Sequence, residues 1–292
     1  MFATLIGNYP PDPDDHDGND AVRRVITELE DAGLEPLSDG QLGPAATDPS
    51  DLVRRWEFAA GSTTHAVKQA LRGPYSQPGP AGAAVDRLRE TIDGLVAAGC
   101  PLIEIEEPDA VRIGDSSREQ RRFSDAHRRL TDGLEASVHL SLVLTGGNAD
   151  TAGAATFFDL PYASYAFDLI AGPDNWRLIA QAPGDRGIVC GALDPRDAAS
   201  DAPEILVWAA HYAASTGGRG IVRVGLANAS GLGGLTRERA RRKAHALGEA
   251  ARLAAVEDPA ELAAMLDPRA VDIRSAAAGR YVPRTARPRG GP

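Results

Sequence analysis

The stretch LIEIEEP, residues 102–108, decides how this chain folds. Its short apolar run predicts a strand over 102–106, and Pro108 marks the end of that strand. In the residues before it, apolar side chains recur at a helical period, at Ala84, Leu88, Ile92, Leu95 and Val96. A helix over 81–98 followed by a strand is therefore one repeat of an alternating α/β pattern.

The same alternation runs along most of the chain. Further strands are expected at 4–6, 34–38, 66–72, 137–144, 164–169, 187–190 and 220–224. Further helices are expected at 20–32, 50–60, 116–132, 173–180, 202–215 and 236–253, and the connection 147–158 is the least clearly helical. Such alternation gives a parallel sheet with right-handed crossovers, and eight units close into a (β/α)8 TIM barrel.

The alternative α/β architecture is an open, doubly wound sheet. Its sequence signature, a GxGxxG turn after the first strand, is missing, and the glycines within 231–234 lie far from that strand. We therefore predict a single barrel domain over 1–279. Residues 280–292 are expected to form a disordered tail.

The charge and composition exclude several classes of protein. The chain has 292 residues and a net charge of −10, whereas a nucleic-acid-binding protein needs a basic face. Its two cysteines, Cys100 and Cys190, are too few for a disulfide framework. The sequence has no run of about 20 apolar residues, and we expect no secretory leader because the chain opens on a predicted strand. We therefore expect a cytoplasmic protein that binds a small-molecule substrate, and neither nucleic acid nor a membrane.

Polar side chains follow nearly every expected strand. Active sites of (β/α)8 barrels form at the carboxyl ends of the strands, so these residues are candidates for substrate binding. They are Asn8, Tyr9, Asp39, Gln41, Tyr75, Glu107, Asp109, Arg112, Ser141, Asp194, Arg196, Asn228 and Ser230.

Three further residues are candidates for catalysis. Glu104 and Glu106 face the same way on one strand, and repulsion between crowded carboxylates raises the pKa of one of them. His139 interrupts an apolar strand, and Asp168 lies near the end of another. We expect Glu106 and His139 to act as an acid–base pair that Asp168 orients. Each also has a structural alternative. One of the glutamates could instead pair with an arginine, and His139 could instead be a core residue whose ring is hydrogen bonded.

Seven short segments at the strand ends are Ile6–Pro10, Ser38–Gln41, Leu71–Tyr75, Ile103–Pro108, His139–Ser141, Leu160–Asp168 and Ser230–Leu232. In their order and rough spacing they resemble the catalytic barrel of cobalamin-independent methionine synthase. That family belongs to a superfamily that also contains uroporphyrinogen decarboxylase-like barrels. The resemblance implies a TIM barrel and methyl or alkyl group transfer.

Members of that family hold a zinc ion with a His-x-Cys pair after the fifth strand, an acidic residue after the sixth and a Cys after the eighth. The resemblance carries these roles to His139, Ser141, Asp168 and Ser230, where hydroxyls replace both thiolates. A serine is a poor zinc ligand at neutral pH because its hydroxyl would have to lose a proton. We therefore expect a zinc-independent protein and no other cofactor.

Other positions of the family pattern also differ. The family binds the amino acid part of homocysteine at positions that match Asn8, Gln41 and Glu106, and Gln41 lacks the charge found there. The tryptophan that stacks on folate has no counterpart near Tyr75, and residues 194–196 replace a proton-donating histidine. The resemblance therefore implies altered chemistry rather than folate-dependent methionine synthesis.

We expect an enzyme that acts on a small polar metabolite by methyl or alkyl transfer, elimination or decarboxylation. Arg112 or Arg196 would hold an anionic group of the substrate. One alternative is a non-catalytic binding or regulatory subunit, paired with a second copy of the chain or with an active enzyme. Another is a site for a harder metal ion made by Glu106, His139 and Asp168.

Overall fold

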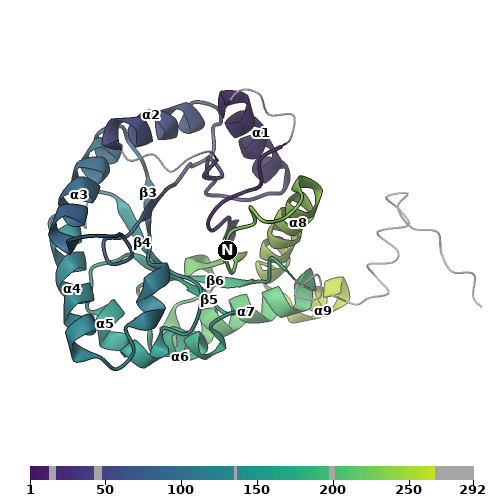
Figure 1. Ribbon diagram of the computed structural model, residues 1–292. Coiled ribbons are helices and arrows are strands. Elements are labelled where there is room, and N and C mark those ends of the chain that lie inside the picture. The colour runs from purple at the N-terminus through teal and green to yellow at the C-terminus, as the bar shows by residue number, and fades with distance from the viewer. Residues whose placement is uncertain (13–17, 43–47, 135–136, 197–200, 267–292) are drawn as a thin grey trace, which may run out of the picture. The chain divides into compact units, whose positions relative to one another are not determined.

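The computed structural model describes residues 1–12, 18–42, 48–134, 137–196 and 201–266. By its internal contacts the chain forms two compact units, 1–254 and 255–292. In the described part of the first unit, seven parallel strands form one sheet in the order β1-β7-β6-β5-β4-β3-β2. The sheet curls, and the helices surround its outer face (Figure 1). The expected tail, 280–292, lies outside the described residues.

The elements alternate as expected, so the α/β class is confirmed. The strands are β1 (Phe2–Thr4), β2 (Gln69–Arg72), β3 (Leu102–Glu106), β4 (His139–Leu144), β5 (Ser164–Asp168), β6 (Gly187–Leu193) and β7 (Val224–Asn228). The helices of the first unit are α1 (Gly18–Asp31), α2 (Pro49–Ala60), α3 (Ala81–Ala97), α4 (Ser117–Thr131), α5 (Ala154–Phe158), α6 (Trp176–Gln181), α7 (Pro203–Ser215) and α8 (Arg237–Ala254). The second unit contains α9 (Pro259–Leu266).

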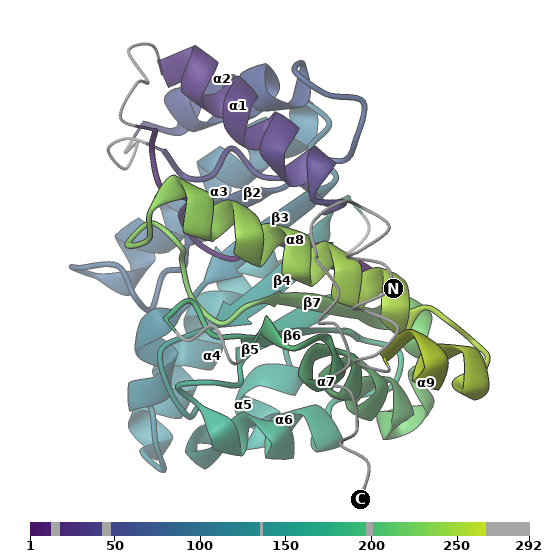
Figure 2. The same ribbon diagram turned by 90° about the vertical axis from the view of Figure 1, so that its right-hand side faces the viewer.

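Amphipathic helices cover the outer face of the sheet. In α3, the apolar side chains at the predicted helical period, Ala84, Leu88, Ile92 and Leu95, are all buried. Helix α8 packs on β1, β7 and α7, and Figure 2 shows it lying across the outside of the sheet. Among the described residues, no helix combines the length and apolar character needed to cross a membrane.

The second expected strand, 34–38, is replaced by a single bridge between Leu37 and Val67. Pro36 explains part of this, because a proline has no N–H to donate to a strand ladder. The segment still hydrogen bonds on both sides. Glu35 N donates to Ala3 O at 2.8 Å, and Lys68 N donates to Leu37 O at 2.9 Å. The sheet therefore has seven regular strands rather than the eight expected, with an irregular segment between β1 and β2.

The first and last strands are displaced from their expected positions. Strand β1 ends at Thr4 because side chains take over the next main-chain groups: Lys68 Nζ donates to Leu5 O, and Ile6 N donates to the side chain of Asn228. Strand β7 starts at Val224 rather than at residue 220. Residues 221–223 form a 3-10 turn, which follows glycines with positive φ at 217, 218 and 220.

A buried ion pair crosses the interior of the curled sheet. Lys68 Nζ lies 2.7 Å from Glu104 Oε1 and also donates to Leu5 O at 2.6 Å. Both charged side chains are almost completely buried. Because a buried charge is costly without its counterion, each member of this pair depends on the other.

We predict that Lys68→Met lowers the free energy of unfolding by about 3–5 kcal/mol, since it leaves the Glu104 carboxylate buried without a counterion. The double variant Lys68→Met/Glu104→Leu should recover most of that loss, because no unpaired charge remains. Urea denaturation of the wild type, both single variants and the double variant measures the coupling. Equal instability of the double variant and Lys68→Met would contradict this account.

Candidate active site

The carboxyl ends of β2 and β3 open into a cavity of about 650 Å³, here called the mouth cavity. Its wall includes Glu106, the last residue of β3, together with Asn8, Asp39 and Gln41. The rest of the wall comes mainly from β2 and from the facing sides of α2 and α3. Barrel enzymes form their active sites at this end of the sheet. The structure therefore brings four of the expected site residues together.

Glu106 is held by a neutral hydrogen-bond donor. Gln41 Nε2 donates to Glu106 Oε1 at 3.0 Å. Burial raises the pKa of the Glu106 carboxyl, and the nearby carboxylate of Glu104 raises that pKa further. The hydrogen bond from Gln41 opposes this shift, but it is the smaller effect. Glu106 is therefore suited to hold and release a proton, as the two glutamates on one face of a strand predicted.

A tight turn presents Gln41 to Glu106. Gln41 has a φ of 49°, which is uncommon for a residue other than glycine, and it follows Gly40 at 73°. The side chain of Asp39 stabilises the turn by accepting a hydrogen bond from Gln41 N at 2.9 Å. Burial also raises the pKa of the Asp39 carboxyl. Two carboxyls with raised pKa values therefore lie in the same cavity wall.

Arginines supply positive charge to the mouth cavity, and they differ from those expected. Arg55 of α2 donates to Leu42 O at 2.9 Å, and Arg72, the last residue of β2, donates to Ser76 O at 2.7 Å. The strand-end rule could have found Arg72. No sequence signal marked Arg55, because it lies within a helix and reaches the cavity only through the packing of α2.

Arg112 and Arg196, the cations expected to bind an anionic group, lie outside the mouth cavity. Both side chains are largely exposed. Arg112 pairs with Asp109 at 3.1 Å, and Arg196 pairs with Asp194 at 3.4 Å. These are ion pairs between near neighbours in the sequence, and such exposed pairs contribute little to stability.

Glu107 is part of a buried network behind β3 rather than of a substrate site. Its Oε1 atom accepts from Tyr75 N at 2.8 Å and lies 3.0 Å from His127 Nε2. The other ring nitrogen of His127 lies 2.6 Å from the hydroxyl of Tyr162. Glu107 and His127 are fully buried. Because adjacent residues of a strand face opposite ways, Glu106 and Glu107 separate to the two sides of the sheet.

Tyr75 belongs to the same outer layer. Its hydroxyl donates to Glu119 Oε2 at 3.0 Å, and its ring packs edge-on against Phe123 of α4. Burial and the bond to Glu119 raise the pKa of Tyr75 to about 12. Tyr75 therefore anchors the loop after β2 to α4 and does not line the mouth cavity.

Tyr9 and Asn228 support the backbone. Tyr9 is buried, and its hydroxyl donates to Glu28 Oε2 at 3.2 Å. Asn228 Oδ1 accepts from Ile6 N at 3.0 Å, and its Nδ2 atom donates to Ile6 O and Ser230 O. The Asn228 side chain thus joins the chain after β1 to the end of β7, and Ser230 lies outside the mouth cavity.

Asp168 is engaged entirely by the backbone. Its Oδ1 atom accepts from the amides of Ile170 and Ala171 at 2.9 and 2.8 Å, and Oδ2 accepts from Gly146 N at 3.0 Å. The carboxylate therefore holds the loops after β4 and β5 in place. Asp168 makes no contact with His139 and therefore does not orient it as expected.

His139 lies at the opposite end of the sheet from Glu106. It is the first residue of β4, where it pairs with Leu102, whereas Glu106 pairs with Val143. The two positions are four residues apart along β4 (143 − 139), or about 13 Å. His139 Nε2 lies 2.8 Å from Ser164 Oγ, and Ser141 is buried further along the strand. The prediction that Glu106 and His139 form an acid–base pair is therefore wrong.

The donor set does not fit the zinc ion of the resembling family. A zinc ion needs its ligands to converge at about 2.0–2.3 Å from one point. His139 begins β4, Asp168 ends β5, and the carboxylate of Asp168 is occupied by amides. Within the described ranges, no three His, Cys, Asp or Glu side chains gather as metal ligands would. The harder-metal alternative built on Glu106, His139 and Asp168 lacks a common site for the same reason.

Several solved protein structures have a similar fold. The chain resembles a B12-independent methionine synthase from Shewanella sp. W3-18-1 with a TM-score of 0.71 and 15% identity over 86% of this chain and 96% of that one. It resembles a putative vitamin-B12 independent methionine synthase from Listeria monocytogenes with a TM-score of 0.67 and 13% identity over 86% and 97%. A methyltransferase from Methanosarcina mazei gives a TM-score of 0.63 and 12% identity over 86% and 94%.

These likenesses establish a TIM-barrel-like fold and, at such low identities, nothing finer. No family model matches the sequence, and a search of curated proteins finds no match.

We predict that the stability contributed by Glu106 depends on pH in an unusual direction. Because the folded-state pKa lies above the ordinary value of 4.5, the folded protein binds this proton more tightly than the unfolded chain does. The free energy of unfolding of the wild type, relative to Glu106→Gln, should therefore rise as the pH falls from 7 towards 4.5. Urea denaturation at several pH values measures this difference.

The control is Glu90→Gln, which alters an exposed carboxylate on α3. Its difference from the wild type should not rise in the same way. A difference for Glu106→Gln that stays flat, or that falls with decreasing pH, would show that the pKa of Glu106 is not raised in the folded protein.

Proposed function

We propose that this protein is an enzyme that acts on a small zwitterionic metabolite and transfers a methyl or related alkyl group without zinc. The observation that carries the proposal is the position of Glu106, a carboxyl with a raised pKa in the wall of the mouth cavity. A carboxyl whose pKa is perturbed, in a cavity at the carboxyl ends of parallel strands, is typical of an active site.

The charges around the mouth cavity suit a zwitterion. Asp39 offers an acceptor for an amino group, and Glu106, which Gln41 fixes in place, adds a second negative charge to the wall. Arg55 and Arg72 offer cationic donors for a carboxylate. A molecule with both groups, such as an α-amino acid, would complement both kinds of charge in the wall.

Group transfer gives Glu106 a defined task. As the bond between the acceptor atom and the alkyl carbon forms, the bond to the leaving group breaks and the leaving group keeps its electron pair. The acceptor loses a proton in this step, and ionised Glu106 accepts it. A raised pKa makes this carboxylate a stronger base than an exposed glutamate. The resemblance to methionine synthases and a methyltransferase supports this reaction class at the level of the fold.

The proposal includes a complete (β/α)8 barrel in which residues 34–38 take the place of an eighth strand. Hydrogen bonds from this segment to Ala3 on one side and with Ala66 and Lys68 on the other support that placement. With residues 34–38 in the place of a strand, Asp39 and Gln41 follow directly after that strand and lie at the mouth cavity.

A non-catalytic binding protein is the second candidate, and a specific observation favours it. Of the three residues expected to carry catalysis, His139 lies at the other end of the sheet and Asp168 is occupied by amides. Only Glu106 remains at the mouth cavity. Ligand binding and turnover must therefore be measured separately.

We predict that L-homocysteine and L-methionine bind the wild type and that Glu106→Gln weakens binding about ten-fold, because a negative charge that attracts the amino group is lost from the cavity wall. Isothermal titration calorimetry gives the affinities. Analogues that lack the amino group or the carboxylate should bind more weakly than either amino acid. Glu90→Gln serves as the matched control and should bind like the wild type. Equal binding by Glu106→Gln and Glu90→Gln would contradict the proposed site.

Turnover separates the enzyme from the binding protein. S-methyl-L-methionine, a sulfonium methyl donor, is mixed with L-homocysteine, and mass spectrometry follows L-methionine formation above the uncatalysed rate. The enzyme should form product, and Glu106→Gln should slow it by about 100-fold, a typical contribution of a general base. Binding of both amino acids without any catalysed product would reject methyl transfer and support the non-catalytic candidate.

A further inference from the structure

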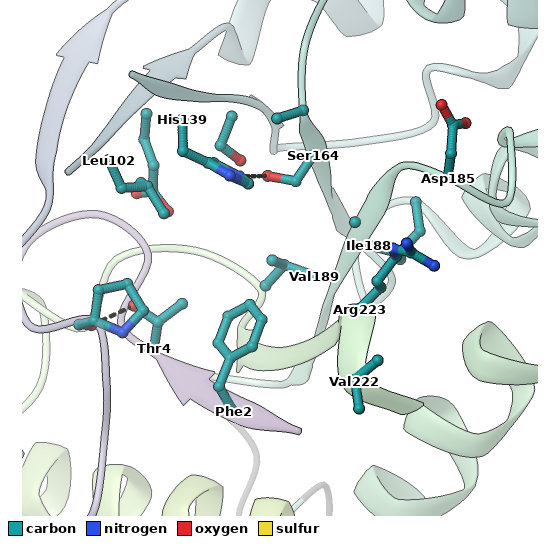
Figure 3. A pocket seen from close by; sticks show the side chains of 15 residues that line it. Phe2, Thr4, Leu102, His139, Ser164, Asp185, Ile188, Val189, Val222 and Arg223 are labelled. Carbon is teal, nitrogen blue, oxygen red and sulfur yellow. Dashed lines mark hydrogen bonds between the residues drawn. The ribbon is translucent and has the colours of Figure 1, made fainter. Parts of the chain in front are cut away.

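The amino-terminal end of the sheet opens into a second cavity, of about 410 Å³, here called the amino-end cavity. Figure 3 shows its wall, with Phe2, Leu102, His139 and Ser164 directed towards a common space. These four residues begin β1, β3, β4 and β5. This end of a (β/α)8 barrel normally serves stability, so a cavity of ligand size here is unexpected.

Two buried oxygens in the wall of this cavity have no hydrogen-bond partner among the described residues. They are Glu104 Oε2 and Ser141 Oγ. Lys68 occupies only the other oxygen of Glu104. Glu104 and Ser141 are each 2% exposed. A buried polar atom without a partner is unfavourable, so a group that reached these two oxygens would bind favourably.

Both oxygens are almost wholly covered, so a ligand meets them only when the side chains turn towards it. Glu104 and Ser141 are paired across β3 and β4, so they face the cavity side by side. One hydroxyl group, which is both a donor and an acceptor, matches this pair. It would donate to the carboxylate and accept from the serine.

The inner wall favours an uncharged molecule. Lys68 already neutralises Glu104, so a charged ligand would leave water without gaining a counterion. Burial lowers the pKa of His139, and its ring contacts Ser164 rather than a carboxylate. Asp185 and Arg223 are the other charged residues of the wall, and Figure 3 shows them away from His139.

The remaining wall is apolar. Phe2, Leu102 and Val189 line the space, and Figure 3 shows Phe2 and Val189 close to its middle. Apolar surface of this kind binds the hydrocarbon part of a ligand. We propose that the amino-end cavity is a binding site for a small uncharged alcohol, whose hydroxyl meets Glu104 and Ser141 while its apolar body packs against Phe2 and Leu102. This site is separate from the mouth cavity, and its test does not depend on the proposed enzymatic reaction.

Three probes with the same ring and different head groups test the proposal: benzyl alcohol, benzylammonium and benzoate. Each is titrated into the full-length protein while NMR follows the ring signals of His139, which the variant His139→Gln assigns. Benzyl alcohol should shift these signals in a saturable way and bind more tightly than either ion. Absence of a saturable shift with benzyl alcohol, or tighter binding of either ion, would overturn the proposal.

Two serine variants locate the hydroxyl of the probe. Ser141→Ala removes the buried hydroxyl and should weaken benzyl alcohol binding about five-fold, the expected loss for one neutral hydrogen bond. Ser137→Ala removes an exposed hydroxyl just before β4 and should leave the affinity unchanged. Thermal denaturation checks that both variants remain folded. Equal affinities for Ser141→Ala, Ser137→Ala and the wild type would overturn the proposed contact.

Discussion

The ion pair between Lys68 and Glu104 connects the main features of this fold. Lys68 enters the interior just before β2, Glu104 lies in the middle of β3, and the ammonium group also binds the main chain after β1. Three successive parts of the curled sheet therefore meet at one buried charge. Because neither charge is stable there alone, the pair fixes which side chains of these segments face inwards. The irregular segment 34–38 is tolerated between them since Lys68 supplies the cross-link that a regular strand would have made.

Glu104 also acts at both ends of the sheet's interior. One of its oxygens pairs with Lys68, and the other faces the wall of the amino-end cavity without a partner. Its charge acts in the other direction on Glu106, where it raises the pKa of the carboxyl at the mouth. Strand β3 and the residue after it thus carry three glutamates in three environments: Glu104 in an ion pair, Glu106 at the mouth cavity and Glu107 in the network behind the sheet. The two-residue period of a strand puts Glu104 and Glu106 on one face of the sheet and Glu107 on the other.

The sequence predicted the α/β class, most helices and the position of Glu106 at the carboxyl end of a strand, because periodicity and strand ends leave clear signals. It placed His139 wrongly because the resemblance carried to His139 a role that belongs after a strand. The expected strand, 137–144, already put this residue near its start, and in the structure His139 is the first residue of β4. The imidazole therefore lies at the opposite end of the sheet from Glu106, and the expected acid–base pair does not form.

The sequence also could not reveal the structural roles of Asp168 and Asn228. Both lie at strand ends, where polar residues usually suggest a site, yet their side chains satisfy main-chain groups of neighbouring loops. Only the three-dimensional path of those loops distinguishes such a support from a catalytic group. Arg55 shows the reverse case, since a helix residue enters the mouth cavity through packing that no local pattern encodes.

The most direct test of the account is the pKa of Glu106 itself, measured by a carbon-13 NMR titration of its side-chain carboxyl with Glu106→Gln for assignment. The account predicts a value above 4.5 in the wild type, and a lower value in Lys68→Met/Glu104→Leu, because the repulsion from Glu104 outweighs the attraction to Lys68. A wild-type value at or below 4.5, or a value that does not change in the double variant, would contradict the claim that the buried pair controls the acid at the mouth.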